Sequence, residues 1–232
     1  MNDNYRTDEL ENAIDYLEKA SLFYSDINYQ HRFKWLMVAL HGALYGFGIL
    51  AIKGSNPSAT VYKSLDGQIN KRVLAEMRDD ISKKYGEDDP GYIDMFIYPA
   101  KGKLLDIRSV LERCQDDQFM LKYTESRSLV LTQAELDAIE KMIDYRNQFA
   151  HFKPMAYVIT GSEEEILKPV FRVIKFLALE CNNILYYGES SKARVEKAID
   201  MMVLPLSSRQ MEKSYAASAH RYSIGARCLS LA

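Results

Sequence analysis

A 17-residue apolar run, residues 36–52, constrains the fold of this chain more than any other feature. Only His41 and Tyr45 interrupt it. A helix that crosses a membrane needs roughly 20 apolar residues, and the sequence holds no second long apolar run. We therefore expect a helix that is buried on most sides within a bundle, rather than a membrane anchor. Three small residues would let a neighbouring helix approach closely: Gly42, Gly46 and Gly48.

The remaining apolar residues recur mostly at the spacing of amphipathic helices, and no segment shows the period-two alternation of a half-buried strand. The sequence therefore predicts an all-α fold. Residues 92–100 are too short and too aromatic to assign. Besides the motif helix discussed below, we expect helices at 7–24, 69–81, 163–188 and 191–204, and one that contains Leu104, Ile107, Val110 and Leu111.

Composition and charge exclude several classes of protein. The net charge is −2, so the chain lacks the overall basic field typical of nucleic-acid-binding proteins, and any polyanion site must be local. Its three cysteines are far apart, which suits reduced thiols in a cytosol. The polar, acidic first residues do not resemble a signal peptide. We expect a cytoplasmic protein without a membrane partner.

Motifs for metal or cofactor binding are missing from the sequence. The four histidines and three cysteines show no HExxH or CxxC spacing. No phosphate-binding GxxxxGK[ST] loop and no GxSxG nucleophile elbow is present. We therefore expect neither a metal site nor a cofactor.

The segment 132-TQAELDAIEKMIDYRNQFAH-151 has the pattern of a packed helix, yet it carries polar residues where the packing alone gives no reason for them. Thr132 and Glu135 form a capping box, which places the helix start near Ala134. At about 100° per residue, Arg146 lies within the apolar stripe of this helix. An unpaired guanidinium buried there would cost several kcal/mol, so an anion must meet it. The stripe consists of Leu136, Ile139, Met142, Ile143 and Ala150.

Two further polar side chains lie at the same end of this helix. Asn147 and His151 are four residues apart on the flank of the stripe, and Pro154 disfavours helix at Lys153. One interpretation is structural: Arg146 forms an ion pair with Asp15 or Glu18 of another helix, and His151 caps its own helix. The other interpretation is a site that binds an anion.

The string Arg146-Asn147-Gln148-Phe149-Ala150-His151 resembles the R-N-x-x-x-H signature of the HEPN superfamily, a group of all-α domains common in prokaryotic defence and toxin-antitoxin systems. Residues 31–54 resemble the second helix of several such proteins. The resemblance implies a HEPN-like helical bundle over 1–189. Inserted helices at about 55–128 would separate the second core helix from the motif helix. Residues 190–232 would form a C-terminal helical extension and tail.

The resemblance also implies a function. Many members of the superfamily are metal-independent endoribonucleases whose active site forms where two motif helices meet in a homodimer. It implies that Arg146, Asn147 and His151 are catalytic and that Lys153 contacts the RNA substrate. It further implies an antitoxin or regulatory protein as a partner.

Two alternatives remain open. The first is a catalytically silent HEPN domain that binds RNA, a nucleotide or a partner protein, with Arg146 as an anion clamp. The second is a helical scaffold protein without a site. The intact set of Arg, Asn and His favours the enzyme over the silent domain, because a silent domain has no chemical need for His151.

Overall fold

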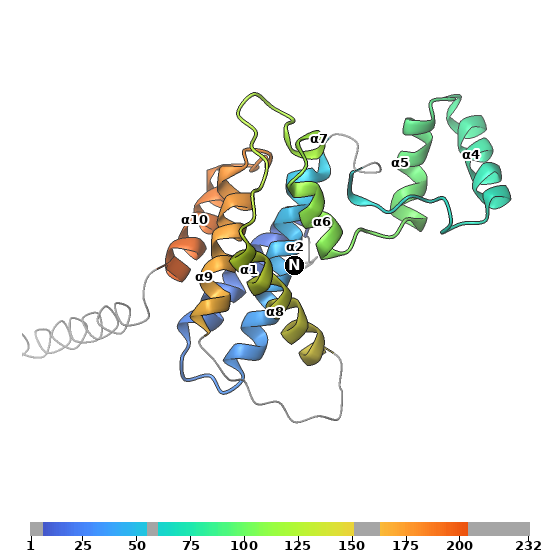
Figure 1. Cartoon of the computed structure of the whole chain (residues 1–232). Coiled ribbons are helices and arrows are strands. Elements are labelled where there is room, and N and C mark those ends of the chain that lie inside the picture. Colours follow the sequence, from blue (N-terminus) through green and yellow to red (C-terminus); the bar gives the residue numbers. More distant parts are fainter. Residues whose placement is uncertain (1–6, 55–59, 151–162, 204–232) are drawn as a thin grey trace, which may run out of the picture.

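The chain folds as an all-α bundle, described here by a computed structural model for residues 7–54, 60–150 and 163–203. Within these ranges no β-strand occurs, and the expected all-α class is confirmed. Figure 1 shows the main body of packed helices, with the hairpin of α4 and α5 standing apart from it at one side.

The central helix is α2 (Arg32–Lys53), which contains the long apolar run. It packs against α1 (Glu9–Ser25), α6 (Ile107–Cys114), α8 (Gln133–Ala150) and α9 (Glu164–Lys175). Leu36, Leu40, Leu44 and other apolar side chains along α2 are fully buried. The other helices of the main body therefore share one hydrophobic core, with α2 in its middle.

The most extensive contact is between α1 and α2. Gly46 lets the two backbones approach, because a Cβ placed there would lie 2.8 Å from the Cβ of Ala13. Helix α1 begins two residues later than expected, since Asp8 rather than Thr7 caps it by accepting a hydrogen bond from the Glu11 N–H at 2.8 Å.

Residues 60–128 contribute to two different cores. Helices α4 (Lys71–Tyr85) and α5 (Pro90–Lys101) form a hairpin whose own small cluster contains Leu65, Leu74, Ile93 and Ile97. Helix α6 and the short α7 (Asp117–Met120) instead pack on α2 in the main core. The backbone bond from the Lys63 N–H to the Lys103 carbonyl, 2.8 Å long, closes the base of the hairpin.

One segment that the sequence left unassigned is helical here, and one expected helix boundary was wrong. The unassigned residues 92–100 belong to α5, which starts at Pro90 because Asp89 accepts a hydrogen bond from the Tyr92 N–H at 2.7 Å. Leu104 is not helical: it pairs with Tyr62 in an isolated β-bridge, and α6 starts only after Asp106 caps it.

The helix expected over 163–188 is shorter than predicted. Regular α-helix ends at Lys175, a π-helical turn follows at Phe176–Glu180, and Asn182 has a positive φ of 60°. The Asn183 amide donates to the Ala51 carbonyl at 3.1 Å and to the Met120 carbonyl at 2.7 Å. These buried bonds tie the chain to the ends of α2 and α7, and a continuing helix would break them.

The last described helix, α10 (Glu189–Val203), packs on α1. Arg194 donates to both oxygens of Glu18, at 2.9 and 2.8 Å, and to Glu11 at 2.7 Å. This segment after residue 189 is therefore joined to the main body by charged side chains as well as by its apolar face.

Among the described helices, α2 alone is long and apolar enough to cross a membrane by length and composition. In its most apolar window, 56% of the residues are buried inside the bundle. The core helix of a soluble bundle meets the same criteria.

We predict that Gly46→Ala lowers the free energy of unfolding by up to about 2 kcal/mol. The new methyl group would overlap Ala13 and force α1 away from α2, at a cost of about 1–3 kcal/mol, and the higher helix propensity of alanine offsets about 1 kcal/mol of it. Gly42→Ala should also be destabilising, because a Cβ there would lie 2.4 Å from a ring carbon of Tyr16, which would have to move. Urea unfolding measures both variants, and a Gly46→Ala protein as stable as the parent would show that the two helices are not in tight contact.

Candidate functional site

Helix α8 starts as the sequence predicts. The Thr132 N–H donates to the Glu135 carboxylate at 2.8 Å, and the Glu135 N–H donates to the Thr132 hydroxyl at 3.3 Å. Arg172 of α9 also forms an ion pair with Glu135, which is buried. The capping box therefore fixes both the start of α8 and its contact with α9.

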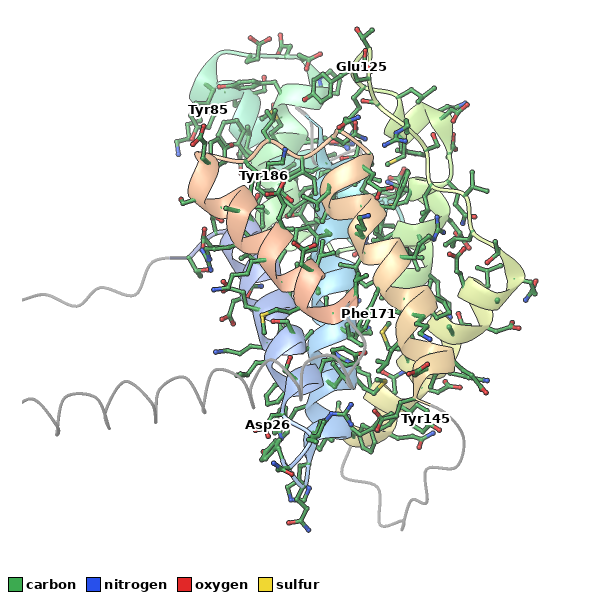
Figure 2. All side chains as sticks on the ribbon, turned by 90° about the vertical axis from the view of Figure 1, so that its left-hand side faces the viewer. Asp26, Tyr85, Glu125, Tyr145, Phe171 and Tyr186 are labelled. Atoms are coloured by element: carbon green, nitrogen blue, oxygen red, sulfur yellow. The ribbon has the colours of Figure 1, made fainter. Side chains whose placement is uncertain are left out.

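Aromatic packing fixes the other end of α8. The ring of Phe33, in the first turn of α2, makes edge-to-face contacts with Tyr145 and Phe149, at centroid distances of 5.1 and 6.1 Å. Figure 2 shows Tyr145 at the same end of the bundle as Asp26 and opposite the end that carries Glu125. Because Tyr145 and Phe149 face α2 at this end, the intervening residues Arg146 and Asn147 present their side chains elsewhere.

Arg146 and Asn147 are half-buried and lie side by side in a groove. The Arg146 Nη1 donates a hydrogen bond of 2.9 Å to the Asn147 Oδ1. The guanidinium has only donors, so it sets the orientation of the Asn147 amide and leaves the amide nitrogen facing away from it. The other two predicted site residues, His151 and Lys153, lie outside the described residues.

No carboxylate of the described residues lies within ion-pair distance of Arg146. The proposed pairing with Asp15 or Glu18 is wrong, because Glu18 is bound by Arg194 and Asp15 lies 3.9 Å from Lys19. The long-range partner of Glu18 comes from α10, which the sequence alone could not place next to α1. Arg146 therefore carries a half-buried positive charge whose only described polar partner is the neutral Asn147.

The groove beside Arg146 has a volume of about 630 Å³ and is walled by α1, α2, α8 and residues 104–108. Such a volume is within the range of about 300–1,000 Å³ typical of sites for small ligands. Helix α2 contributes His41 and Tyr45, one turn apart, with ring centroids 6.5 Å apart. Tyr45 is held in place because its hydroxyl donates to the Leu105 carbonyl at 2.7 Å.

The charged residues at the rim of the groove have partners of their own. Lys53 pairs with Glu9 and lowers the pKa of that carboxyl. Lys63 lies 2.9 Å from Asp106 and lowers its pKa to about 2. Arg108 is bound by both oxygens of Glu140, at 2.8 and 2.6 Å. Arg146 is thus the lining cation whose charge no described carboxylate balances.

His41 is the residue that sequence reasoning missed. Burial lowers its pKa to about 4, and the nearby positive charge of Arg146 adds to the effect, so the ring is neutral near pH 7. The signal was present in the sequence: His41 and Tyr45 are the two polar interruptions of the apolar run, and their spacing of four places them on one face of a helix.

Other titratable groups do not form a second centre in the described part of the chain. Cys114 and Cys181 are buried, and burial raises the pKa of both thiols, so neither is a reactive thiolate. No group of three or more His, Cys, Asp or Glu side chains between residues 7 and 203, gaps excepted, is placed to hold a metal ion. Comparison of the chain with protein-family models, curated proteins and solved structures gives no match.

The low pKa of His41 predicts a pH dependence of stability. The unfolded chain binds a proton at this residue below about pH 6.5, whereas the folded protein does so only near pH 4. The free energy of unfolding should therefore fall by up to about 3 kcal/mol, from this residue alone, as the pH drops from 6.5 to 4.

Urea unfolding at pH 7 and pH 4.5 measures this contribution as the difference between the parent and His41→Gln. The variant keeps a polar side chain but does not titrate, so its stability should fall less on acidification. An equal loss of stability in both proteins would mean that His41 is solvated and that folding does not lower its pKa.

Proposed function

We propose that the protein is a metal-independent endoribonuclease of HEPN type, as the R-N-x-x-x-H motif implies. One observation of the structure carries the proposal: Arg146 presents a half-buried charge to a groove and has no carboxylate partner among the described residues. A buried charge is costly unless an anion meets it. An RNA phosphate supplies such an anion, and a guanidinium binds it through two parallel hydrogen bonds.

The residue types suit cleavage by the RNA's own 2′-OH group. The 2′-oxygen attacks the adjacent phosphorus, and the bond from phosphorus to the 5′-oxygen breaks. One proton leaves the 2′-OH and one is delivered to the 5′-oxygen, which yields a 2′,3′-cyclic phosphate and a 5′-OH. His151 is the proposed proton-transfer group, because imidazole titrates near neutral pH.

Arg146 and Asn147 would divide the binding of the phosphate between them. Arg146 offsets the charge that builds up on the phosphate oxygens in the transition state. Asn147 already uses its Oδ1 as acceptor for Arg146, so its amide hydrogens are the part that orients a phosphate oxygen or the imidazole. Lys153 adds a contact to a neighbouring phosphate of the RNA backbone.

The proposal includes a homodimer. His151 follows Arg146 by five positions, and five steps of about 100° would turn the two side chains about 140° apart on one helix. Two α8 helices that face each other across a two-fold axis would bring an Arg146 and a His151 to one groove. Light scattering at micromolar concentration reports the assembly, and a monomer would remove the basis for a composite site.

A cytoplasmic toxin-antitoxin or phage-defence system, with an antitoxin or regulatory protein as partner, is the proposed context.

We predict that cleavage of single-stranded RNA by the purified protein persists in EDTA, because the nucleophile and the charge stabilisation come from the RNA and from protein side chains. Gel analysis with end-group mapping should find 2′,3′-cyclic or derived 3′ phosphates. Complete loss in chelator, restored by magnesium or manganese, would contradict the mechanism.

We also predict that Arg146→Ala and His151→Ala both abolish cleavage while their melting temperatures stay close to that of the parent. Removing Arg146 strands no described carboxylate, so the cost of about 3–5 kcal/mol for breaking a buried ion pair does not arise. Cleavage and thermal unfolding should be measured on the same preparations.

Arg194→Ala is the matched control for these variants. It leaves Glu11 and Glu18 without their common cation, so it should lower the melting temperature yet leave the folded protein able to cleave RNA. Folded Arg146→Ala or His151→Ala proteins that cut RNA as fast as the parent would end the ribonuclease proposal.

A further inference from the structure

The groove extends well beyond Arg146, along the side of α2. Its wall on α2 carries His41 and Tyr45, and its wall on α1 carries Tyr16. A phosphate held by Arg146 would occupy only one end of a space of about 630 Å³. The part beside Tyr16, His41 and Tyr45 suits a ligand part that packs on aromatic rings and forms hydrogen bonds, while the charged residues at the rim, Glu9, Asp106 and Arg108, are already paired.

The ring of Tyr16 has room in the groove because position 42 of α2 is a glycine. Its ring lies against Gly42, where a Cβ would overlap the ring carbons. The side chain is nevertheless 37% exposed, so part of its ring faces the open groove. A flat ring with a free surface is the kind of partner on which a nucleobase stacks, whatever its sequence.

His41 lies next to Gly42 and lines the same space, but it cannot serve as a second phosphate ligand. Its pKa of about 4 keeps the imidazole uncharged at neutral pH, because the ring is largely buried and Arg146 is close. A neutral imidazole presents one N–H donor and one acceptor nitrogen. No hydrogen bond to His41 occurs within the described residues, so both groups remain for a ligand.

We propose, building on the ribonuclease function above, that this part of the groove is the nucleoside subsite: His41 hydrogen-bonds the base of the nucleotide whose phosphate Arg146 holds, and that base stacks on Tyr16. His41 is then the residue that selects the nucleotide at the cleavage site. A cation, a ring with a free face and a neutral donor–acceptor pair along one groove match a phosphate joined to a heterocycle. An apolar ligand would leave His41 and Arg146 without partners.

Recognition of single-stranded RNA commonly combines these two contacts, stacking on an aromatic side chain and hydrogen bonding to the edge of the base. In this groove the contacts come from different helices, α1 for the stacking ring and α2 for the hydrogen bonds. The close approach of α1 and α2 at Gly42 and Gly46 sets the distance between them.

The first test is direct binding of the four nucleoside 3′-monophosphates and of inorganic phosphate, measured by calorimetry. The parent should prefer one base. His41→Phe keeps a ring but removes both hydrogen-bonding groups, so it should bind the preferred nucleotide at least about tenfold more weakly, which is the loss expected from one such bond alone. Its affinity for inorganic phosphate should not change, because Arg146 is intact.

Matched controls separate the subsite from a general effect on α1 or α2. His31→Phe alters another histidine, at the start of α2 and outside the groove, and should leave the base preference as it is. Tyr16→Leu should weaken all four nucleotides together. Tyr29→Leu alters a tyrosine of similar exposure, 39%, that does not line the groove, and should not weaken any of them.

The second test maps cleavage positions in a random RNA library. His41→Phe should flatten the sequence preference, and His41→Gln, which keeps a donor and an acceptor, should retain part of it. The proposed nucleoside subsite would be ruled out if the parent bound all four nucleotides equally, or if a folded His41→Phe protein kept the parent's base preference.

The two proposals fail in different ways. If the protein binds nucleotides with a base preference that depends on His41 but cuts no RNA, the proposed nucleoside subsite stands and the proposed ribonuclease function does not. If RNA cleavage depends on His151 but does not change when His41 is replaced, the ribonuclease function stands and the nucleoside subsite does not. If His41→Phe does not fold, His41→Leu, which also removes both hydrogen-bonding groups, and Tyr16→Leu decide through the same binding measurement.

Discussion

The burial of α2 is the constraint on which the rest of this structure depends. Its apolar side chains can be removed from water only if other helices cover it on several sides, and α1, α6, α8 and α9 do so. The two glycines at its contact with α1 bring these helices close together. The same packing leaves His41 and Tyr45 at a face of α2 that opens to the groove. The core thus creates the groove in the course of covering its central helix.

The unbalanced charge of Arg146 gives this groove its chemistry. The other charged side chains at the rim, Glu9, Asp106 and Arg108, each have an oppositely charged partner. Arg146 has Asn147 instead, which fixes the guanidinium without neutralising it. A positive charge that is half-buried, oriented and unpaired in the described structure stabilises an incoming anion more strongly than a solvated one would.

Local signals in the sequence predicted much of the fold. The capping box of Thr132 and Glu135 placed the start of α8, and the apolar run placed α2, because both depend on residues close together in the chain. The end of α9 could not be predicted in this way. Asn183 stops the helix by bonding to Ala51 and Met120, which are far away in sequence. Residues 92–100 looked too short for a helix because the helix start lies before them: Asp89 caps α5 and Pro90 is its first residue.

The candidate site was predicted in part. Arg146 and Asn147 are joined by a hydrogen bond, and their role in the motif stays a prediction. The pairing of Arg146 with Asp15 or Glu18 failed, because α10 supplies Arg194 to Glu18. The spacing of His41 and Tyr45 places both on one face of α2, but whether that face lines a groove depends on how α1, α2 and α8 meet, which no local pattern predicts.

Binding of a single-stranded RNA that cannot be cleaved, with 2′-O-methyl groups throughout, tests most directly whether Arg146 is a phosphate ligand. Arg146→Ala should bind it at least about tenfold more weakly than the parent, as expected when a charge-assisted hydrogen bond is removed. A plot of the logarithm of the binding constant against that of the salt concentration should become shallower by about 0.7 for each phosphate that the variant no longer neutralises. A folded Arg146→Ala protein with the parent's affinity and salt dependence would contradict the account.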